Sequence, residues 1–348
     1  MKIKNREISL RKPPFIIAEI SANHNKSIER TLKLIDEAKK AGADAVKLQT
    51  YTAQDMTLNS NKKEFIISDK NSLWYKKKLF DLYNKGSLPI KWYRDIFNRA
   101  KKNNIICFST PFSENSVDIL NNFNVPAFKI ASFENTHYPL IYKVIKSKKP
   151  IIISLGVSKL NEIEHLVKLL KKNKVKNFAL LKCNSSYPAN FEESNLKTII
   201  DLKKKFKVEI GLSDHTPGIG AAITAVAYGA SIIEKHFTLN KKGGGLDDSF
   251  SIEPDELNYL VVESYRAWKS KGKVYYGYTK SEKRSKIFKR SIFCNKNIKK
   301  GEKFTKENIK LLRPNTGLHP KYYYKILGKK SLSNIKFATP LKKKYIKF

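Results

Sequence analysis

The chain has 348 residues and a mass of 40.0 kDa, which exceeds the usual domain length of roughly 100 to 200 residues and predicts one large fold plus a smaller unit. Hydrophobic residues at 41% and aromatic residues at 11% exclude a disordered chain. The net charge of +38 suggests a protein that binds nucleic acid. However, only nine of the 69 basic residues are arginine, and the lysines occur in nearly every helical segment. We therefore expect a solvated lysine surface and no nucleic-acid partner.

The N-terminal segment MKIKNREISLRKPPF lacks the apolar core of a signal peptide. The sequence contains no run of about 18 apolar residues that would span a bilayer. Cys107, Cys183 and Cys294 are too few and too scattered for a disulfide framework, which is typical of a reducing compartment. We therefore expect a cytoplasmic protein with no membrane partner.

From Phe15 onward, short β-branched runs alternate with segments of helical periodicity, as expected for parallel strands joined by crossover helices. The predicted strands are 15–21, 45–50, 106–111, 127–132, 151–156, 178–185, 209–214 and 231–237. The segment 27–42 keeps Leu32, Ile35 and Ala38 on one face, so it is predicted to form a helix that ends at Gly42. Eight evenly spaced βα units favour an α/β fold of the (β/α)8 TIM-barrel type over an open doubly wound sheet, because no GxGxxG follows the first strand.

The connection after the second strand is unusually long. It runs from Tyr51 to about Gly86 and contains Trp74, Leu79 and Tyr83. A connection of this length at the top of a barrel is typical of a segment that shapes a substrate pocket.

A closing helix is predicted within 251–273, with Glu253 near its N-terminus, where negative charge is favoured. We expect the barrel domain to comprise residues 1–271 and to be followed by a linker at 272–286. Residues 287–348 show short strands, glycine turns and no long helix, which predicts a second, small domain.

The functional groups of a TIM barrel gather at the C-terminal ends of its strands, and these ends are polar here. They present Glu19, Ser21, Asn23, His24, Lys47, Gln49, Thr50, Ser109, Thr110, Phe112, Lys129, Ser132, Glu134, Lys182, Asn184, Ser185, Tyr187, Ser213, Asp214, His215, Glu234, Lys235 and His236. Lys47, Lys129 and Lys235 stand in apolar strand runs, where a lysine is rarely buried unless it is paired. With the neighbouring hydroxyls, the three lysines predict a surface that binds phosphate and carboxylate.

His215 and His236 end the last two predicted strands, which are neighbours in a closed barrel. Neutral imidazole is a common ligand of divalent metals, so the pair predicts a metal site with open positions, to which Asp247 and Glu19 are candidate additions. Two hydrogen-bonded core histidines are the alternative. A glycosidase using Glu19 with Glu134 or Glu234 is a further one, but it leaves the lysines and histidines unexplained.

The segments AEISANH, ADAVKLQTY, CFSTPF, FKIASFE, GLSDHT, IEKHFTL and GLHP resemble the sialic acid synthase family over essentially the whole chain. The resemblance implies a barrel followed by a small antifreeze-like (SAF) domain, and condensation of phosphoenolpyruvate with an amino-sugar aldehyde. SANHNKS, MTLNS, SLWYKKKLFDLY, CNSSYP, GGGLDDSFSIEP and RPNTGLHPKYY are most similar to its pseudaminic acid branch, whose sugar is 2,4-diacetamido-2,4,6-trideoxy-altropyranose. The N-acetylneuraminate and legionaminate branches remain alternatives, as does a non-catalytic protein that binds polyanions or a surface.

Carried over position by position, the resemblance implies that phosphoenolpyruvate is bound by Lys47, Thr110, Lys129, Ser132, Ser185 and Ser213. It implies that a divalent cation (Mn, Mg or Co) is held by His215 and His236 and polarises the sugar aldehyde. The resemblance places Glu19 and Glu134 on the sugar side. We expect both to be catalytic, with Glu134 as the candidate that manages the proton of the attacking water. The implied sugar ligands are Gln49, Phe112, Tyr187, Asp247 and Arg313, the last from a neighbouring subunit of a domain-swapped homodimer.

Three positions depart from the family pattern. Asn184 stands where the family usually has threonine, Leu246 where it has proline, and Asp248 where it has a small polar residue. None of the three is an implied ligand of the metal or the phosphate, so the implied reaction class is unaffected.

Overall fold

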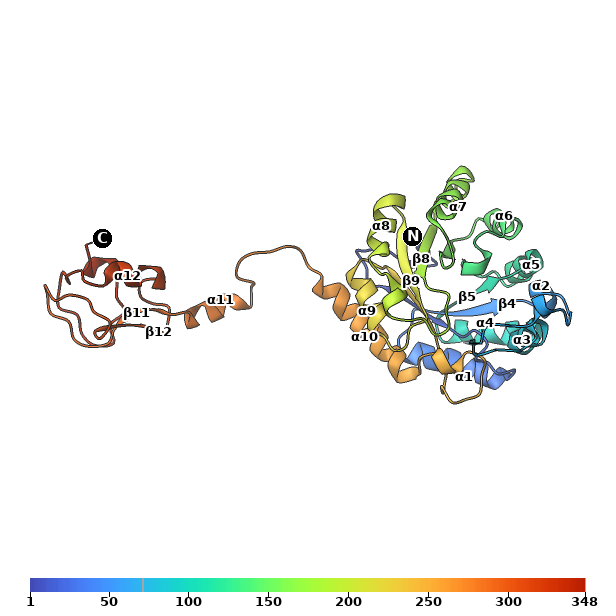
Figure 1. The fold of residues 1–348 in the computed structure, drawn as a ribbon, viewed down its shortest axis with the longest axis horizontal. Helices are drawn as coiled ribbons and strands as arrows, with labels where there is room; N and C mark the ends of the chain where they lie inside the picture. Colours follow the sequence, from blue (N-terminus) through green and yellow to red (C-terminus); the bar gives the residue numbers. More distant parts are fainter. Residues whose placement is uncertain (71, 348) are drawn as a thin grey trace. The chain divides into compact units, whose positions relative to one another are not determined.

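The computed structural model describes residues 1–70 and 72–347, and the chain divides into two compact units, Met1–Gly272 and a second that begins at Lys273. All eight predicted strands form a closed parallel barrel in the first unit (Figure 1). The ring closes where β10 pairs with both β3 and β9. The strands are β3 (Phe15–Glu19), β4 (Ala45–Thr50), β5 (Ile106–Pro111), β6 (Phe128–Ile130), β7 (Ile151–Ser154), β8 (Phe178–Cys183), β9 (Glu209–Asp214) and β10 (Ile232–His236). The prediction of a TIM barrel is confirmed.

Helices lie outside the ring of strands and follow them in sequence (Figure 1). The outer helices are α1 (Ile28–Lys40), α4 (Tyr93–Lys102), α5 (Glu114–Asn122), α6 (Tyr138–Lys146), α7 (Leu160–Lys172), α8 (Thr198–Phe206), α9 (Gly220–Ala227) and α10 (Pro254–Ser270). Helix α1 begins after Ser27, whose hydroxyl accepts the backbone N–H of Arg30 at 3.0 Å, and it is followed by Gly42 at φ +93°.

Two separate apolar clusters hold the barrel together. The larger one lies between strands and helices, and its strand contribution includes Ile16, Ala18 and Ile233. The smaller one includes the alternate residues Phe15 and Ile17. It also includes Ile3, which lies in a short hairpin of β1 (Lys2–Ile3) and β2 (Arg6–Glu7), and Ile8, which follows that hairpin. Alternation along each strand therefore fills the barrel interior with apolar side chains near the strand starts.

The long connection after β4 has its own short elements. These are α2 (Ala53–Met56), a 3-10 turn at Lys63–Phe65, an antiparallel bridge between Ile66 and Lys78, and α3 (Leu79–Gly86). A capping box between Thr52 and Asp55 starts α2. Among the residues that the structure describes, no helix is long and apolar enough to cross a membrane.

The second unit has a core of its own, which includes Ile292, Phe304, Ile309, Ile326 and Leu341. Its elements are short, as the sequence predicts: α11 (Glu282–Ser285), α12 (Tyr323–Ile326), and an antiparallel pair of β11 (Ser291–Cys294) and β12 (Ile309–Leu312).

Candidate active site

Polar side chains occupy the inward positions at the C-terminal ends of the barrel strands. On β3, Phe15 and Ile17 pack in the barrel interior and the next inward residue is Glu19; on β10, Ile232 packs there and Glu234 and His236 follow. Because inward side chains recur every second residue, each strand contributes apolar residues to the bottom of the barrel and then charged or polar residues to the cavity above them.

This inner cavity has a volume of 50 Å³. It is lined by Glu19, Lys47, Gln49, Thr110, Phe112, Lys129, Ala131, Ser132, Ser154, Cys183, Tyr187, Ser213, His215, Glu234 and His236. Five of the six residues that the sequence assigns to phosphoenolpyruvate line it. The sixth, Ser185, lies just behind, with its Oγ 3.7 Å from Sγ of Cys183.

The buried lysines of the cavity are paired with buried carboxylates. Lys47 is 4% exposed, forms an ion pair with Glu19 and donates to Oγ1 of Thr110 at 3.0 Å. Lys129 is 2% exposed, and its Nζ lies 3.7 Å from Oε1 of Glu234, which is also 3.9 Å from Nζ of Lys47. The two lysines and two carboxylates balance one another, as buried charges require.

The electrostatics of the two carboxylates differ. Burial raises the pKa of Glu19 to about 7, although Lys47 opposes the shift. Burial also acts to raise the pKa of Glu234, but Lys129 and Lys47 outweigh it and lower this pKa below its ordinary value. Glu234 is thus the fixed anion between the lysines, held by a 3.1 Å hydrogen bond from Ser213.

The third lysine does not belong to the cavity, so the prediction that Lys235 contributes to the anion-binding surface is wrong. It is 1% exposed, but its Nζ donates to Oδ2 of Asp214 at 2.8 Å and to the carbonyl of Thr216 at 2.6 Å. Lys235 alternates with Glu234 and His236, and therefore points to the outer face of the sheet, where the ion pair joins β9 to β10.

The two histidines converge as the sequence predicts: their ring centroids are 5.3 Å apart. Nδ1–H of His215 donates to the carbonyl of Asn184 at 2.7 Å, so Nε2 is the nitrogen without a proton when this ring is neutral. Burial acts to lower the pKa of His215, but Cys183 and the carbonyl of Asn184 outweigh it and raise this pKa above its ordinary value. Nδ1 of His236 is buried without a hydrogen-bond partner in the described part of the chain and lies 3.9 Å from Oδ2 of Asp247. Burial, together with nearby His215 and Lys47, lowers the pKa of His236 well below its ordinary value, so this imidazole is neutral.

A neutral imidazole with an unused nitrogen is the form that binds a divalent metal, so the histidine pair fits such an ion. Within residues 1–70 and 72–347, no group of three or more His, Cys, Asp or Glu side chains is arranged to hold a metal. A divalent ion held by the two histidines would take its further ligands from substrate or water. Glu19, one of the candidate additions, is engaged by Lys47 instead.

A second cavity of 370 Å³ opens beside the first and shares with it Gln49, Phe112, Ala131, Tyr187 and His236. Its remaining lining residues are Ser21, Ala22, Tyr51, Met56, Ile67, Trp74, Leu79, Leu82, Tyr83, Phe133, Glu134, Leu246 and Asp247. This outer cavity contains every sugar-side residue that the sequence assigns to the barrel. Arg313 is exposed in the second unit, at the end of β12.

Glu134 is the titratable group that stands out in the outer cavity. It ends a 3-10 turn, Ser132–Glu134, that follows β6, and its Oε2 is buried without a hydrogen-bond partner among the described residues. Burial raises its pKa to about 7, against the lowering effect of Lys129. A carboxyl group with this pKa exchanges protons readily near neutral pH.

Sequence reasoning missed part of both cavities. Ser154 ends β7, accepts a 2.5 Å hydrogen bond from Lys129 and lines the inner cavity, but the predicted site contains no residue of this fifth strand. Most of the apolar wall comes from the long connection after β4, and the prediction that this connection shapes a pocket is confirmed by Trp74, Leu79 and Tyr83 in the wall. The path of the connection, and with it the place of Met56 and Ile67, does not follow from strand periodicity. A larger hollow of 560 Å³ lies near the starts of α8 and α9, but it lacks the buried ion pairs of the inner cavity, so we do not assign the site there.

The chain is similar to known proteins over most of its length. The chain matches the NeuB family over residues 34–276 and the SAF domain over residues 289–347. It is 45% identical to the pseudaminic acid synthase of Campylobacter jejuni over 331 residues, covering 95% of this chain and 96% of the relative. The N,N'-diacetyllegionaminic acid synthase of the same species is 39% identical over 333 residues, covering 93% of this chain and 98% of the relative.

Among solved structures, the N-acetylneuraminic acid (sialic acid) synthetase of Leptospira borgpetersenii is similar, with a TM-score of 0.73 and 35% identity. The match covers 82% of this chain and 94% of that one.

Proposed function

The chain belongs to the NeuB family, and we propose that it is a pseudaminic acid synthase. It would condense phosphoenolpyruvate with 2,4-diacetamido-2,4,6-trideoxy-β-L-altropyranose and water to give pseudaminate and phosphate. The observation that carries the proposal is the pair of joined cavities, one with buried lysines and hydroxyls and one with an aromatic and aliphatic wall.

The inner cavity suits the phosphate and carboxylate of phosphoenolpyruvate. Lys47 and Lys129 supply positive charge, and Thr110, Ser132 and Ser213 supply hydroxyl donors on the same wall. Because the lysines are already fixed by Glu19 and Glu234, they keep their positions while charge develops on the departing phosphate.

The chemistry forms one bond between C3 of phosphoenolpyruvate and the aldehyde carbon of the open-chain sugar. Water adds to C2, and the C2–O bond to phosphate breaks as the product acid forms. A divalent cation held by His215 and His236 would supply Lewis-acid polarisation of the aldehyde. Glu134, whose pKa is raised and whose Oε2 has no hydrogen-bond partner among the described residues, would take the proton of the water.

The outer cavity favours a deoxy sugar with acetamido groups. Its wall of Met56, Ile67, Trp74, Leu79 and Leu82 is apolar and suits the C6 methyl and the acetyl methyl groups. Gln49 and Asp247 supply polar partners for the hydroxyl and amide groups. N-acetylmannosamine carries a hydroxyl at C6, and its burial against this wall would leave that hydroxyl without a partner. A legionaminate precursor, which is also deoxygenated at C6, is the second candidate.

Phosphate release from phosphoenolpyruvate with each of the three sugars, with and without chelator, tests the proposal. We expect the altrose-derived sugar to give the highest kcat/KM, and chelation to remove the activity until a divalent ion is restored. A higher kcat/KM for N-acetylmannosamine would refute the sugar assignment, and no phosphate release with any sugar would refute the reaction.

A further inference from the structure

The loop after β10, residues 239–251, leaves the barrel and returns to the same point. Its ends are joined by hydrogen bonds from the N–H of Thr238 to the carbonyl of Ile252 at 2.9 Å and from the N–H of Ile252 to the carbonyl of His236 at 2.9 Å. Two residues of this loop, Leu246 and Asp247, line the outer cavity. The conformation of the loop therefore decides where Asp247 stands.

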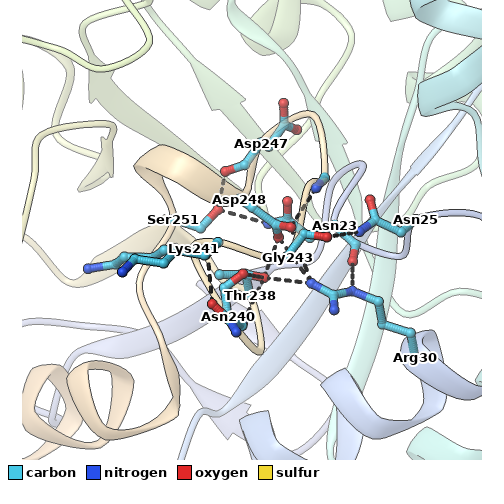
Figure 2. Close-up of polar contacts among 12 residues, drawn as sticks. Asn23, Asn25, Arg30, Thr238, Asn240, Lys241, Gly243, Asp247, Asp248 and Ser251 are labelled. Atoms are coloured by element: carbon cyan, nitrogen blue, oxygen red, sulfur yellow. Dashed lines mark hydrogen bonds and ion pairs between the residues drawn. The ribbon is translucent and has the colours of Figure 1, made fainter.

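The middle of the loop is held by one buried carboxylate. Asp248 is 1% exposed, and its oxygens accept the N–H of Gly245 at 2.6 Å, the hydroxyl of Thr238, and Nη2 of Arg30 at 3.1 and 3.3 Å. Figure 2 shows this carboxylate between Arg30 and the loop. Asp248 thus connects three parts of the barrel unit: the loop, the end of β10 and helix α1.

Arg30 is itself fixed on two further sides. Its Nε donates to the carbonyl of Asn23 at 2.6 Å, and its Nη2 also donates to Oγ1 of Thr238 at 3.1 Å (Figure 2). The amide of Asn23 in turn donates to Oγ of Ser251 at 2.8 Å, at the end of the same loop. A planar guanidinium with several bound N–H groups holds a carboxylate in one orientation, which an ammonium group does not do.

The three consecutive glycines of the loop are required by this arrangement. A Cβ atom on Gly243 would lie 2.8 Å from Oδ2 of Asp248, and one on Gly245 would lie 2.7 Å from the same oxygen. Between them, Gly244 has φ +79°, a conformation that favours glycine. The glycines therefore let the loop backbone approach the carboxylate of Asp248.

The neighbouring Asp247 points the other way, toward the cavity. Its Oδ2 accepts the hydroxyl of Ser21 and lies 3.4 Å from the N–H of Ala22, and its carbonyl accepts the hydroxyl of Ser251 at 2.7 Å. We propose that Arg30 and Asp248 form a clamp that positions Asp247 for the sugar, and so set the affinity for the sugar and not for phosphoenolpyruvate. The inference rests on the proposed function for the identity of the two substrates.

Asp248→Asn tests the clamp without removing its shape. The variant keeps one oxygen acceptor, and Arg30 remains 20% exposed, so its charge stays hydrated. We expect the KM for the sugar to rise at least 10-fold while the KM for phosphoenolpyruvate changes less than twofold. Arg30→Lys should give a smaller rise, and the double variant Arg30→Lys/Asp248→Asn should be no worse than Asp248→Asn alone.

Lys241→Gln is the matched control, because Lys241 lies on the same loop and pairs with Glu256 at 2.7 Å outside the clamp. It should leave both KM values within twofold. Gly245→Ala is the second variant, since its Cβ displaces the carboxylate of Asp248 with both charges kept, and it should repeat the effect on the sugar KM.

Hydrogen exchange of the substrate-free protein separates failure of the clamp from failure of the proposed function. In Asp248→Asn, we expect faster exchange at residues 243–250 and unchanged exchange elsewhere in the barrel. Unchanged exchange in that segment, or KM values for both substrates that rise equally, would overturn the clamp. If the unmodified enzyme releases no phosphate with any sugar, the proposed function fails, and the exchange result still decides whether Asp248 holds the loop.

Discussion

For the substitution Glu134→Gln, the structure predicts how kcat and its pH dependence should change. A pKa raised from 4.5 to about 7 means that burial favours the neutral carboxyl by about 3 kcal/mol. If this carboxylate accepts the proton of the attacking water, kcat rises with pH through about 7 as Glu134 ionises, and glutamine removes both that dependence and about 100-fold or more of the rate.

The raised pKa of Glu134 also makes the free energy of unfolding depend on pH. Between pH 4.5 and about 7 the folded protein holds a proton that the unfolded chain has lost, so the free energy of unfolding decreases as the pH rises through this window. Glutamine cannot ionise, and Glu134→Gln should therefore be relatively more stable than the unmodified protein at pH 8 than at pH 4.

Two measurements check the prediction: kcat from pH 5.5 to 9 with both substrates saturating, and thermal unfolding over pH 4 to 8. Glu164→Gln, at an exposed position of α7, is the control and should alter neither. A Glu134→Gln enzyme that keeps both its rate and the rise of kcat near pH 7 would show that another group handles the proton.

Further substitutions address the remaining parts of the site. Lys47→Met should lower the free energy of unfolding by about 3 to 5 kcal/mol, because it leaves the carboxylate of Glu19 buried and unpaired, and adding Glu19→Gln should recover part of the loss in denaturant titrations. His236→Ala should abolish metal-dependent phosphate release while calorimetry still detects phosphoenolpyruvate binding; full activity would refute its role. Trp74→Ala should lower kcat/KM for the deoxy sugar about 10-fold and leave the KM for phosphoenolpyruvate unchanged. Mixing inactive Arg313→Ala and His236→Ala subunits should restore part of the activity if a homodimer shares its sites, and no recovery would count against domain swapping.

The barrel and most of its inner cavity follow from the period of two in the strands. Once eight apolar runs are placed in parallel order, the side chain two positions after the last inward apolar residue has to face the chamber at the strand ends, which is how Lys47 is found, and His236 follows two positions after Glu234. The same period distinguishes Lys129 from Lys235. Glu234 and His236, the neighbours of Lys235 on β10, both face the cavity, so Lys235 faces the other side of the sheet. Both lysines look alike as buried charges in apolar runs, and only the parity of the strand register distinguishes a ligand from a structural ion pair.

The outer cavity does not follow from any periodicity. Its wall is formed by the connection after β4 and by the loop after β10. The conformation of such segments depends on side-chain contacts between parts of the chain that are distant in sequence. Arg30 and Asp248 are 218 positions apart, and before the fold is known Arg30 is a surface charge of an amphipathic helix and Asp248 is a departure from a family pattern. In the folded chain, the carboxylate of Asp248 binds Arg30 and the backbone N–H of Gly245, and so holds the loop that carries Asp247. If the clamp acts as proposed, the residues that separate one amino-sugar substrate from another include positions that never touch the sugar.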